Sequence, residues 1–323
     1  MEIIESLDVL DIYKSPSVVT LGNFDGVHLG HRELFRQAVR RARQTEARSV
    51  VYTFEPHPLK VLFPERAPLL LNTPAEKERL ISASHIDQLI RAPFTPAIAS
   101  LSAEDFVRET LVNKLKAVHL IVGYDYAFGR GREGDGQFLS KQGEKYGFGV
   151  DVLHPVGADG QPYSSTGIRQ KLAAGDVSGV VELLGRHYTL EGRVVAGDQR
   201  GRTIGFPTAN LVTEKEQLPA PGVYSVKVRQ RQKEYGGVVN IGERPTFGGG
   251  IQTIEVHLLD FTGDLYGEVL RLYFVERLRR EQSFSTVEEL KIAISHDILQ
   301  SRQQLESTRI IQYREYLSSL EPY

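Results

Sequence analysis

The arrangement of hydrophobic residues changes near residue 186, and this change most constrains the fold of the chain. Before residue 186, short apolar strands alternate with amphipathic helical segments. Such alternation predicts a mainly parallel sheet with crossover helices. After it, short strands separated by glycine turns take over, a pattern typical of a small antiparallel barrel. Because 323 residues also favour two domains over one, we predict an α/β domain over residues 1–185 and a β-barrel domain over residues 186–323.

The individual elements follow from hydrophobic periodicity and from capping signals. The predicted strands of the first domain are residues 18–21, 49–54, 88–90, 118–122 and 149–153. Its predicted helices are residues 32–43, 74–81, 137–146, 170–174 and 177–184, with another that begins at Ser102. The predicted strands of the barrel are residues 188–195, 222–228, 236–241, 253–260 and 270–275. A capping box at Ser285-Thr286-Val287-Glu288 predicts a C-terminal helix with one apolar stripe, formed by Leu290, Ile294 and Ile298.

The composition excludes several classes of function. A net charge of -2 gives no whole-chain electrostatic basis for binding nucleic acid or a membrane. The absence of cysteine excludes disulfides, thiol catalysis and Cys-ligated clusters. The run MEIIESLDVLDIY has no apolar core long enough for a signal peptide or a membrane span. We therefore expect a cytoplasmic protein that binds neither nucleic acid nor a membrane, and weak self-association stays open.

The loop after the first long strand, Gly22 to His31, is the first stretch that indicates a chemistry. His28 and His31 are three residues apart, so both side chains share one face of a helix start. The N-terminus of a helix presents backbone N–H groups and a positive dipole end, which suit phosphate. Histidine pairs at this spacing also occur on ordinary helix surfaces, and that alternative stays open on spacing alone. Zinc is less favoured, because no cysteine or third ligand is near.

Three further stretches lie where ligands bind in parallel sheets or at helix starts. His57 stands between two prolines directly after a strand, which places it at the carboxyl edge of the sheet or in a simple turn. Asp125 follows the strand 118–122 and either binds a ligand hydroxyl or amine, or caps a turn. The run Ser164-Ser165-Thr166-Gly167-Ile168-Arg169 opens a helix. Its hydroxyls and its arginine indicate a second phosphate site or ordinary capping.

The barrel half holds two more candidate sites. The loop 197–210 is glycine-rich and basic, so its backbone can wrap a phosphate. Thr208 and Asn210 are two residues apart and point the same way in an extended segment. Their oxygens can hold Mg²⁺ between phosphates, or they can belong to a turn with satisfied polar groups. Glu255 alternates with the apolar residues of its strand, which suits either a general base or an exposed polar face.

Taken in order, these stretches resemble a known family over essentially the whole chain. The matching blocks are GNFDGVHLGH, FEPHP, VGYDYAFGRG, SSTGIR, GFPTAN and IEVHLLDFTGDLYGE. The chain resembles the prokaryotic bifunctional riboflavin kinase/FMN adenylyltransferases, or FAD synthetases. The resemblance implies a Rossmann-like nucleotidyltransferase domain followed by a riboflavin kinase barrel. It also implies ATP, riboflavin and FMN as substrates, FAD as product and Mg²⁺ as cofactor.

For the first domain, the resemblance implies a grip on the triphosphate of ATP. His28 and His31 would stabilise charge as pyrophosphate leaves. The other phosphate-binding residues would be Asn23, Gly22, Gly30, Ser164, Ser165, Thr166 and Arg169. The flavin or adenine side would be lined by His57, Asp125, Phe54 and Phe128. One departure is Gly167, where many relatives carry a larger and often basic residue. One positive charge that would face the triphosphate is therefore missing.

For the barrel, the resemblance implies that Thr208 and Asn210 bind the metal, with Gly201 and Gly205 near phosphate. Glu255 would be the base that activates the ribityl 5′-hydroxyl of riboflavin. Two other functions compete with this hypothesis. An adenylyltransferase with a single activity, for nicotinate or pantetheine phosphate, has no use for the Thr208–Asn210 segment and Glu255. A flavin-binding sensor without catalysis has no need to keep His28 and His31.

Overall fold

The computed structural model describes residues 1–5, 15–158, 160–197, 200–244 and 251–313. Contacts between backbone segments divide the chain into two units, Met1–Ser164 and Ser165–Tyr323. The second unit therefore includes two helices, α7 (Ser165–Ala174) and α8 (Val177–Leu184), in addition to the barrel. Each unit is described by itself.

The first unit is built on a six-stranded sheet in which all neighbouring strands are parallel. In spatial order the strands are β1 (Glu2–Ile4), β4 (Gln88–Pro93), β3 (Arg48–Glu55), β2 (Ser17–Leu21), β5 (Ala117–Gly123) and β6 (Gly149–Leu153). This confirms the predicted parallel sheet and its five predicted strands. The short edge strand β1 lies outside the prediction, because three residues are too few to show a period.

The strand order reverses at the middle of the sheet, which is where parallel sheets form their ligand-binding crevice. From β2 the chain runs outward through β3 to β4, and then returns to the other side of β2 to form β5 and β6. The carboxyl ends of β2 and β5 therefore flank the point where the order reverses. In open parallel sheets, ligands bind outside the strand ends at such a point. The loops after β2 and β5 carry two of the motifs found in the sequence.

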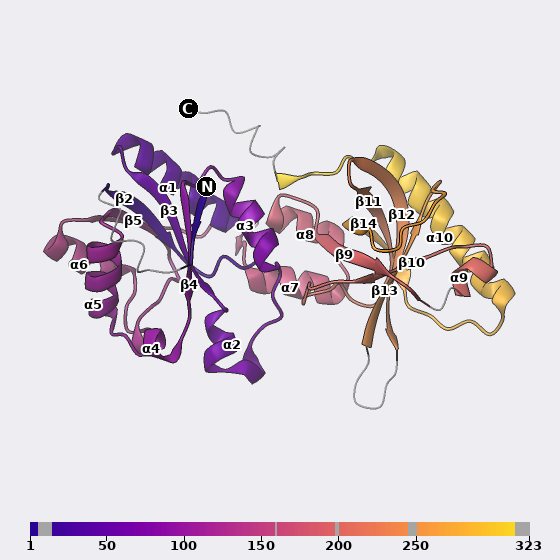
Figure 1. Ribbon diagram of the computed structural model, residues 1–323, viewed down its shortest axis with the longest axis horizontal. Helices are drawn as coiled ribbons and strands as arrows, with labels where there is room; N and C mark the ends of the chain where they lie inside the picture. Colours follow the sequence, from indigo (N-terminus) through magenta and orange to yellow (C-terminus); the bar gives the residue numbers. More distant parts are fainter. Residues whose placement is uncertain (6–14, 159, 198–199, 245–250, 314–323) are drawn as a thin grey trace. The chain divides into compact units, whose positions relative to one another are not determined.

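Helices cover both faces of this sheet (Figure 1). The helices of this unit are α1 (Leu29–Gln44), α2 (Pro58–Leu62), η2 (Pro64–Arg66), α3 (Pro74–Ser82), α4 (Pro96–Ala99), α5 (Ala103–Asp105), η3 (Phe106–Lys114), η4 (Arg130–Arg132) and α6 (Gly136–Tyr146). α1 packs against β2, β3 and β5. On the sheet, Leu21 and Tyr52 join Phe106, Leu111 and Leu139 in one buried core. The predicted helix after Ser102 becomes π-helical from Phe106, which still buries the predicted apolar face.

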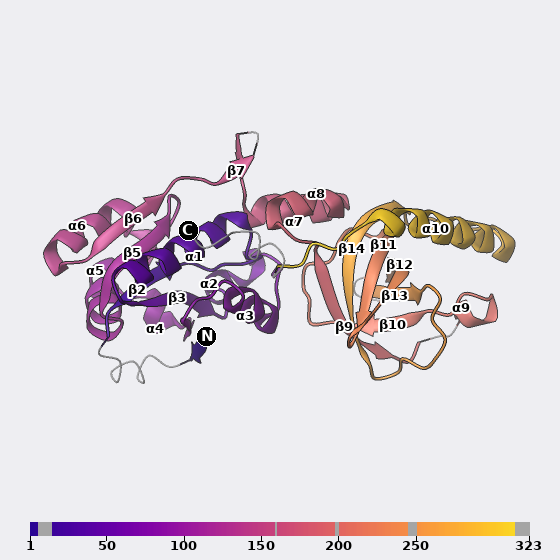
Figure 2. The ribbon, with the colours of Figure 1, turned by 90° about the horizontal axis from the view of Figure 1, so that it is seen from above.

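The second unit contains a closed antiparallel barrel (Figure 2). Around the barrel the strands are β10 (Ala209–Val212), β13 (Ile251–Leu258), β12 (Lys233–Arg244), β11 (Gly222–Gln230), β14 (Val269–Arg280) and β9 (Thr189–Val195). The barrel prediction is confirmed, with β10 as an added strand. β10 has only four residues, of which Leu211 alone is buried, so its sequence shows no apolar alternation.

A short two-stranded ribbon, β7 (Gly157–Ala158) and β8 (Gln161–Pro162), belongs to the first unit.

Helices α7 and α8 pack together, and α8 lies against β14. The guanidinium of Arg277 on β14 donates one hydrogen bond to the carbonyl of Ala174 at 3.1 Å and another to that of Pro221. Gly175 has a left-handed φ of 80°, which favours glycine, and a Cβ there would also lie 2.5 Å from the same guanidinium. The N–H of Ala220 also donates to a carbonyl of α7. The C-terminal end of α7 is therefore fixed to the barrel.

The C-terminal helix α10 (Val287–Ser307) lies along β11, β12 and β14 (Figure 1). Its N-cap is Thr286, whose hydroxyl accepts a hydrogen bond from the N–H of Glu289 at 3.1 Å, so the capping box begins one residue later than predicted. The predicted stripe is only half-buried. The buried face instead centres on Asp297, Ser301 and Leu305. Polar contacts with the barrel, such as the ion pair of Arg279 with Asp297 at 2.9 Å, replace apolar packing here.

Candidate functional site

The loop after β2 places His28 at the N-cap of α1. His28 Nδ1 accepts a hydrogen bond from the backbone N–H of His31, at 3.3 Å. In a neutral imidazole this leaves the ring proton on Nε2, which is then a hydrogen-bond donor. The same turn presents the N-terminal N–H groups and the positive dipole end of α1. The start of α1 is therefore suited to bind an anion.

The rings of His28 and His31 share one face of this helix start, as their spacing predicts. The two rings stack, with centroids 3.6 Å apart and planes 23° apart. The buried ring of Phe24 meets His31 edge to face at 5.3 Å. Phe24 and Val27 adopt left-handed backbone conformations, with φ of 49° and 41°. Such strain persists only where packing holds it, and both side chains are fully enclosed here.

Gly30 brings the histidine motif close to the end of the first unit. A Cβ on Gly30 would lie 3.1 Å from the His28 ring and 3.7 Å from the carbonyl oxygen of Tyr163. Ser164, the first residue of the serine–threonine–arginine motif, follows Tyr163 directly. Packing also explains the glycine at position 22, since a Cβ there would lie 3.0 Å from the ring of Phe24. Asn23 accepts a hydrogen bond at its carbonyl from the hydroxyl of Thr53, at 3.2 Å.

His57 and Asp125 follow the carboxyl ends of β3 and β5, at the same sheet edge as His28. His57 is the N-cap of α2, and its Nδ1 accepts a hydrogen bond from the N–H of Leu59 at 3.2 Å. Its side chain is half-buried. Asp125 is exposed, and its Oδ1 would lie 3.2 Å from a Cβ on Gly123. Both side chains are therefore accessible to a ligand in the crevice.

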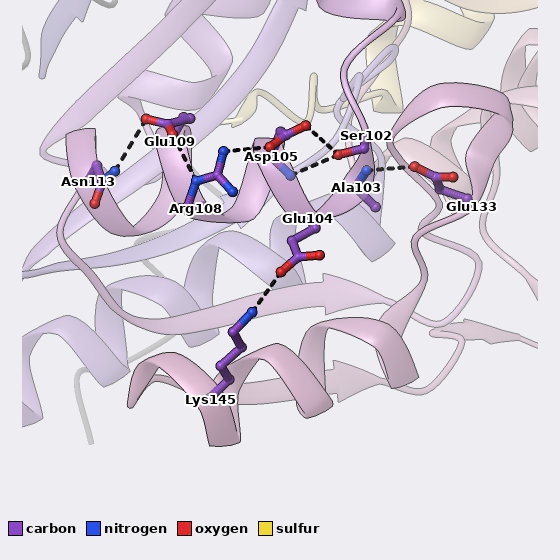
Figure 3. Close-up of polar contacts among 9 residues, drawn as sticks. All are labelled: Ser102, Ala103, Glu104, Asp105, Arg108, Glu109, Asn113, Glu133 and Lys145. Atoms are coloured by element: carbon purple, nitrogen blue, oxygen red, sulfur yellow. Dashed lines mark hydrogen bonds and ion pairs between the residues drawn. The ribbon is translucent and has the colours of Figure 1, made fainter.

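The loop after β5 is fixed to the start of α5 (Figure 3). The carboxylate of Glu133 accepts a hydrogen bond from the N–H of Ala103 at 2.8 Å, and the hydroxyl of Ser102 accepts one from the N–H of Asp105 at 3.0 Å. Gly129 has a left-handed φ of 74°, and a Cβ there would lie 2.7 Å from the backbone nitrogen of Ala103. These contacts hold the loop that carries Asp125.

Phe54 and Phe128, predicted on the flavin or adenine side, belong to an aromatic cluster. Tyr52 meets Phe54 edge to face at 5.4 Å, and Phe128 stacks on Tyr126 at 5.6 Å. Phe54 is half-buried, whereas Phe128 is only 8% exposed and lies in the core. Burial raises the pKa of Tyr52 and of Tyr126 well above the ordinary tyrosine value. Both tyrosines therefore stay neutral at physiological pH.

Most of the serine–threonine–arginine motif lies inside α7. The helix begins at Ser165 rather than at the predicted Gln170, so the polar residues of the motif occupy its first turns. Ile168 is fully buried, whereas Ser165 and Arg169 are half-buried and Thr166 is exposed. The buried isoleucine orients the turn, and the hydroxyls stand where helix N–H groups suit an anion.

In the barrel unit, Thr208 and Asn210 both point toward the segment that ends in the short helix α9 (Arg200–Thr203). A Cβ on Gly201 would lie 3.2 Å from Thr208 Oγ1, and a Cβ on Gly197 would lie 2.0 Å from Asn210 Nδ2. The two glycines therefore leave room beside these polar groups. Gly205 has a left-handed φ of 94° with open space around it. Residues 198–199 of this loop lie outside the described residues.

Glu255 lies beside Asn210 in the barrel wall. Strand pairing places Glu255 of β13 directly opposite Asn210 of β10 on one side. On its other side it lies directly opposite Asn240 of β12. The neighbours of Glu255 in its strand, Ile254 and Val256, are buried, so Glu255 is on the outer face of the barrel. Periodicity alone does not single out Asn240, because only the strand pairing brings it to Glu255.

Comparison with known proteins accounts for both units. A family described as FAD synthetase matches residues 11–167, and one described as riboflavin kinase matches residues 184–305. A protein of Escherichia coli (strain K12), named bifunctional riboflavin kinase/FMN adenylyltransferase, is 41% identical over 287 residues, which cover 88% of this chain and 92% of that protein. The chain belongs to the bifunctional riboflavin kinase/FMN adenylyltransferase family. This confirms the resemblance found in the sequence.

Other members and a solved structure extend this relationship. The bifunctional riboflavin kinase/FMN adenylyltransferase of Pseudomonas fluorescens is 40% identical and is covered over 97% of its length. A crystal structure from Streptococcus pneumoniae, titled a macrolide-efflux protein, superimposes with a TM-score of 0.84 at 34% identity, over 93% of this chain and 98% of that one. In the part of the chain that the structure describes, no helix is long and apolar enough to cross a membrane.

Charged side chains alone do not build a metal site here. Among the described residues, no three His, Asp or Glu side chains form a group that could hold a metal ion. A site made by the Thr208 hydroxyl and the Asn210 amide is of a different kind, because both are neutral oxygen donors that share a cation with phosphates. Glycine at positions 197 and 201 keeps a side chain from crowding these two donors.

Proposed function

We propose that this chain makes FAD from riboflavin in two ATP-dependent steps. The barrel phosphorylates riboflavin to FMN, and the parallel-sheet domain adenylylates FMN to FAD with release of pyrophosphate. The observation that carries the proposal is the match of two different family models, in this order, to the two parts of one chain. We take residues 1–185 and 186–323 as the two catalytic domains, because the riboflavin kinase match begins at residue 184.

In the first step, Glu255 acts as the general base. Its carboxylate accepts the proton of the ribityl 5′-hydroxyl while that oxygen attacks the γ-phosphorus of ATP, and ADP leaves. An alcohol is a weak nucleophile at neutral pH, so a base lowers the barrier. The outward position of Glu255 next to Asn210 supports this role.

The same step uses Mg²⁺, for which Thr208 and Asn210 are the proposed protein ligands. The Thr208 hydroxyl and the Asn210 amide are hard oxygen donors, and glycine at positions 197 and 201 keeps a side chain from crowding them. Bound there, Mg²⁺ would neutralise charge on the phosphates of ATP. Gly201 and Gly205 let the backbone of this loop approach those phosphates.

In the second step, a phosphate oxygen of FMN attacks the α-phosphorus of ATP, and pyrophosphate leaves. This nucleophile is already an anion, so the site needs charge stabilisation rather than a base. His28 donates through Nε2, and His31 lies stacked beside it. The remaining contacts to the triphosphate come from Gly22, Asn23, Gly30, Ser164, Ser165, Thr166 and Arg169. Gly167 adds no side chain to them.

The flavin or adenine side is assigned to four residues of the first domain. Phe54 and His57 are half-buried and Asp125 is exposed, so their side chains are accessible at the crevice. Phe128 contributes mainly by supporting these residues from the core, since it is only 8% exposed. An aromatic floor suits the planar isoalloxazine ring.

The test is to incubate the purified protein with riboflavin, ATP and Mg²⁺ and to separate the flavins by chromatography. We expect FMN first and FAD next. FMN without FAD contradicts the role of the first domain. Unchanged riboflavin contradicts the kinase step, and a second incubation that starts from FMN then tests adenylylation alone. Flavin binding without any conversion identifies a sensor instead.

Location and assembly belong to the same proposal. We propose a cytoplasmic protein that binds small molecules, and not nucleic acid or membrane, in keeping with its net charge of -2. Any self-association is expected to be weak. Cell fractionation and sedimentation at several protein concentrations check these two points.

A further inference from the structure

Glu255 has an amide side chain on each side of it in the barrel wall. The registers of β10, β13 and β12 put Asn210, Glu255 and Asn240 in one row across three adjacent strands. Residues directly opposite each other in antiparallel strands have Cβ atoms about 5 Å apart and share one face. The side chain of Glu255 therefore leaves the barrel wall between those of two asparagines.

The position of Asn240 is as well defined as that of Glu255. Its strand neighbours Val239 and Ile241 are fully buried, so Asn240 is held on the outer face of the barrel. Gly242, the next residue on this face, leaves space beside the amide, since a Cβ there would lie 3.3 Å from Asn240 Nδ2. Within the described residues, the amide of Asn240 has no hydrogen-bond partner that would turn it elsewhere.

The other polar residues of this face do not occupy the same position. His257 of β13 faces Val238 across the strands, and its Nδ1 lies 2.8 Å from the carbonyl oxygen of Pro207. Thr253 faces Gly242, one step further along the row. The carboxylate of Glu281 lies beyond, 2.8 Å from the place of a Cβ on Gly242. Asn240 is thus the β12 side chain in register with Glu255.

We propose that Asn240 is a positioning residue for Glu255 in the kinase step. The inference rests on the proposed role of Glu255 as base. With riboflavin bound, the amide N–H of Asn240 donates to one oxygen of the Glu255 carboxylate, and this holds the other oxygen toward the ribityl hydroxyl. Asn210, on the opposite side, is left for the metal and the phosphates.

The experiment replaces the amide with a carboxylate of the same size. In Asn240→Asp a second negative charge faces Glu255, which raises the pH at which the pair becomes fully ionised. We expect the acidic limb of kinase kcat/KM against pH to move up by about one pH unit or more. Asn240→Ala lacks the donor, and we expect kcat to fall about 10- to 100-fold with little change in the KM for ATP.

Controls separate this inference from misfolding and from the proposed function. The melting temperature and circular dichroism of each variant report that the barrel is folded, and conversion of FMN to FAD reports that the first domain is intact. Thr253→Ala, on the same face but out of register with Glu255, is expected to keep the wild-type pH profile. If Glu255→Gln abolishes the kinase while Asn240→Asp keeps the wild-type profile and kcat, only the role of Asn240 is overturned. If Glu255→Gln stays active, Glu255 is not the base, and the proposed role of Asn240 is overturned as well.

Discussion

The histidine motif and the barrel row build their polar clusters by different means. His28 and His31 are three residues apart and are held by one helix start, where His28 caps the N–H of His31. Asn210, Glu255 and Asn240 come from three strands and meet only through strand register. In the proposed reactions, the first cluster offers donors to an anion, and the second offers a carboxylate to an alcohol. The difference follows from the nucleophile, because phosphate is already ionised and a hydroxyl is not.

This contrast predicts that each step can be removed without the other. The largest effect is expected for Glu255→Ala. Removing a positioned base costs about 10²- to 10⁴-fold in rate, so FMN formation from riboflavin should fall by that factor. Conversion of supplied FMN to FAD should continue at the wild-type rate, and chromatography of both reactions measures this. Loss of both steps together, in a chain that keeps its thermal stability, would mean that the two sites are not separate.

The reverse result is expected for His28→Ala. The loss of a donor to the developing charge costs about 10²- to 10³-fold, here in FMN-to-FAD conversion, while riboflavin phosphorylation is retained. The substitution also removes an N-cap, which costs about 1 kcal/mol of stability.

The matched variant His28→Asn separates these two effects. Asparagine restores an acceptor for the N–H of His31 but not the ring, so we expect near wild-type stability with the same loss of FAD synthesis. Substantial FAD synthesis by either variant would remove the phosphate role of His28.

The two clusters also differ in how far the sequence alone could predict them. The pairing of His28 with His31 is local, and the helix that begins beside them follows from its own periodicity. The barrel row is not local, because β10 is too short to show alternation. A slip of one residue in β13 would move Glu255 to the opposite face, and a slip in β10 or β12 would remove one of its neighbours. Sequence periodicity therefore predicts the parallel sheet and the barrel, whereas the neighbours of Glu255 become known only from the strand pairing.

A smaller effect is expected from glycines that leave room for these clusters. In Gly197→Ala the new Cβ would lie 2.0 Å from Asn210 Nδ2, so the amide must turn away. We expect kinase kcat to fall about 10-fold, a loss typical of a displaced group in a positioned site. In Gly30→Ala the Cβ would lie 3.1 Å from the His28 ring, a milder contact.

The pair of glycine variants tests whether crowding by the new Cβ causes the loss of activity. Gly30→Ala is expected to lower FAD synthesis only a few-fold, and alanine favours the helix by about 1 kcal/mol. Measured kcat values for both reactions, with the melting temperature of each variant, give the comparison. A larger loss in Gly30→Ala than in Gly197→Ala would contradict the spatial explanation.

The smallest effect concerns the barrel unit away from either cluster, at His187. The N–H of Ile311 donates to His187 Nδ1 at 3.0 Å, and the N–H of His187 donates to the carbonyl of Ile311 at 3.1 Å. Burial lowers the pKa of His187 below the ordinary histidine value, although its contact with the Ile311 carbonyl opposes this. A proton on Nδ1 would displace the N–H of Ile311. The neutral ring therefore holds the segment that ends at Tyr313.

Because the pKa of His187 is lower in the folded than in the unfolded chain, the unfolded chain binds more protons as the pH falls. The stabilisation is complete above the unfolded pKa of about 6.5 and is lost as the pH falls through the lower folded value. The slope for one such proton is at most about 1.4 kcal/mol per pH unit. Hydrogen exchange at the amide of Ile311, corrected for intrinsic rates, should show protection that falls below pH 6.5. His187→Gln should flatten this dependence, whereas the exposed His296→Gln in α10 should keep it; an unchanged pH dependence in His187→Gln would assign the effect to another group.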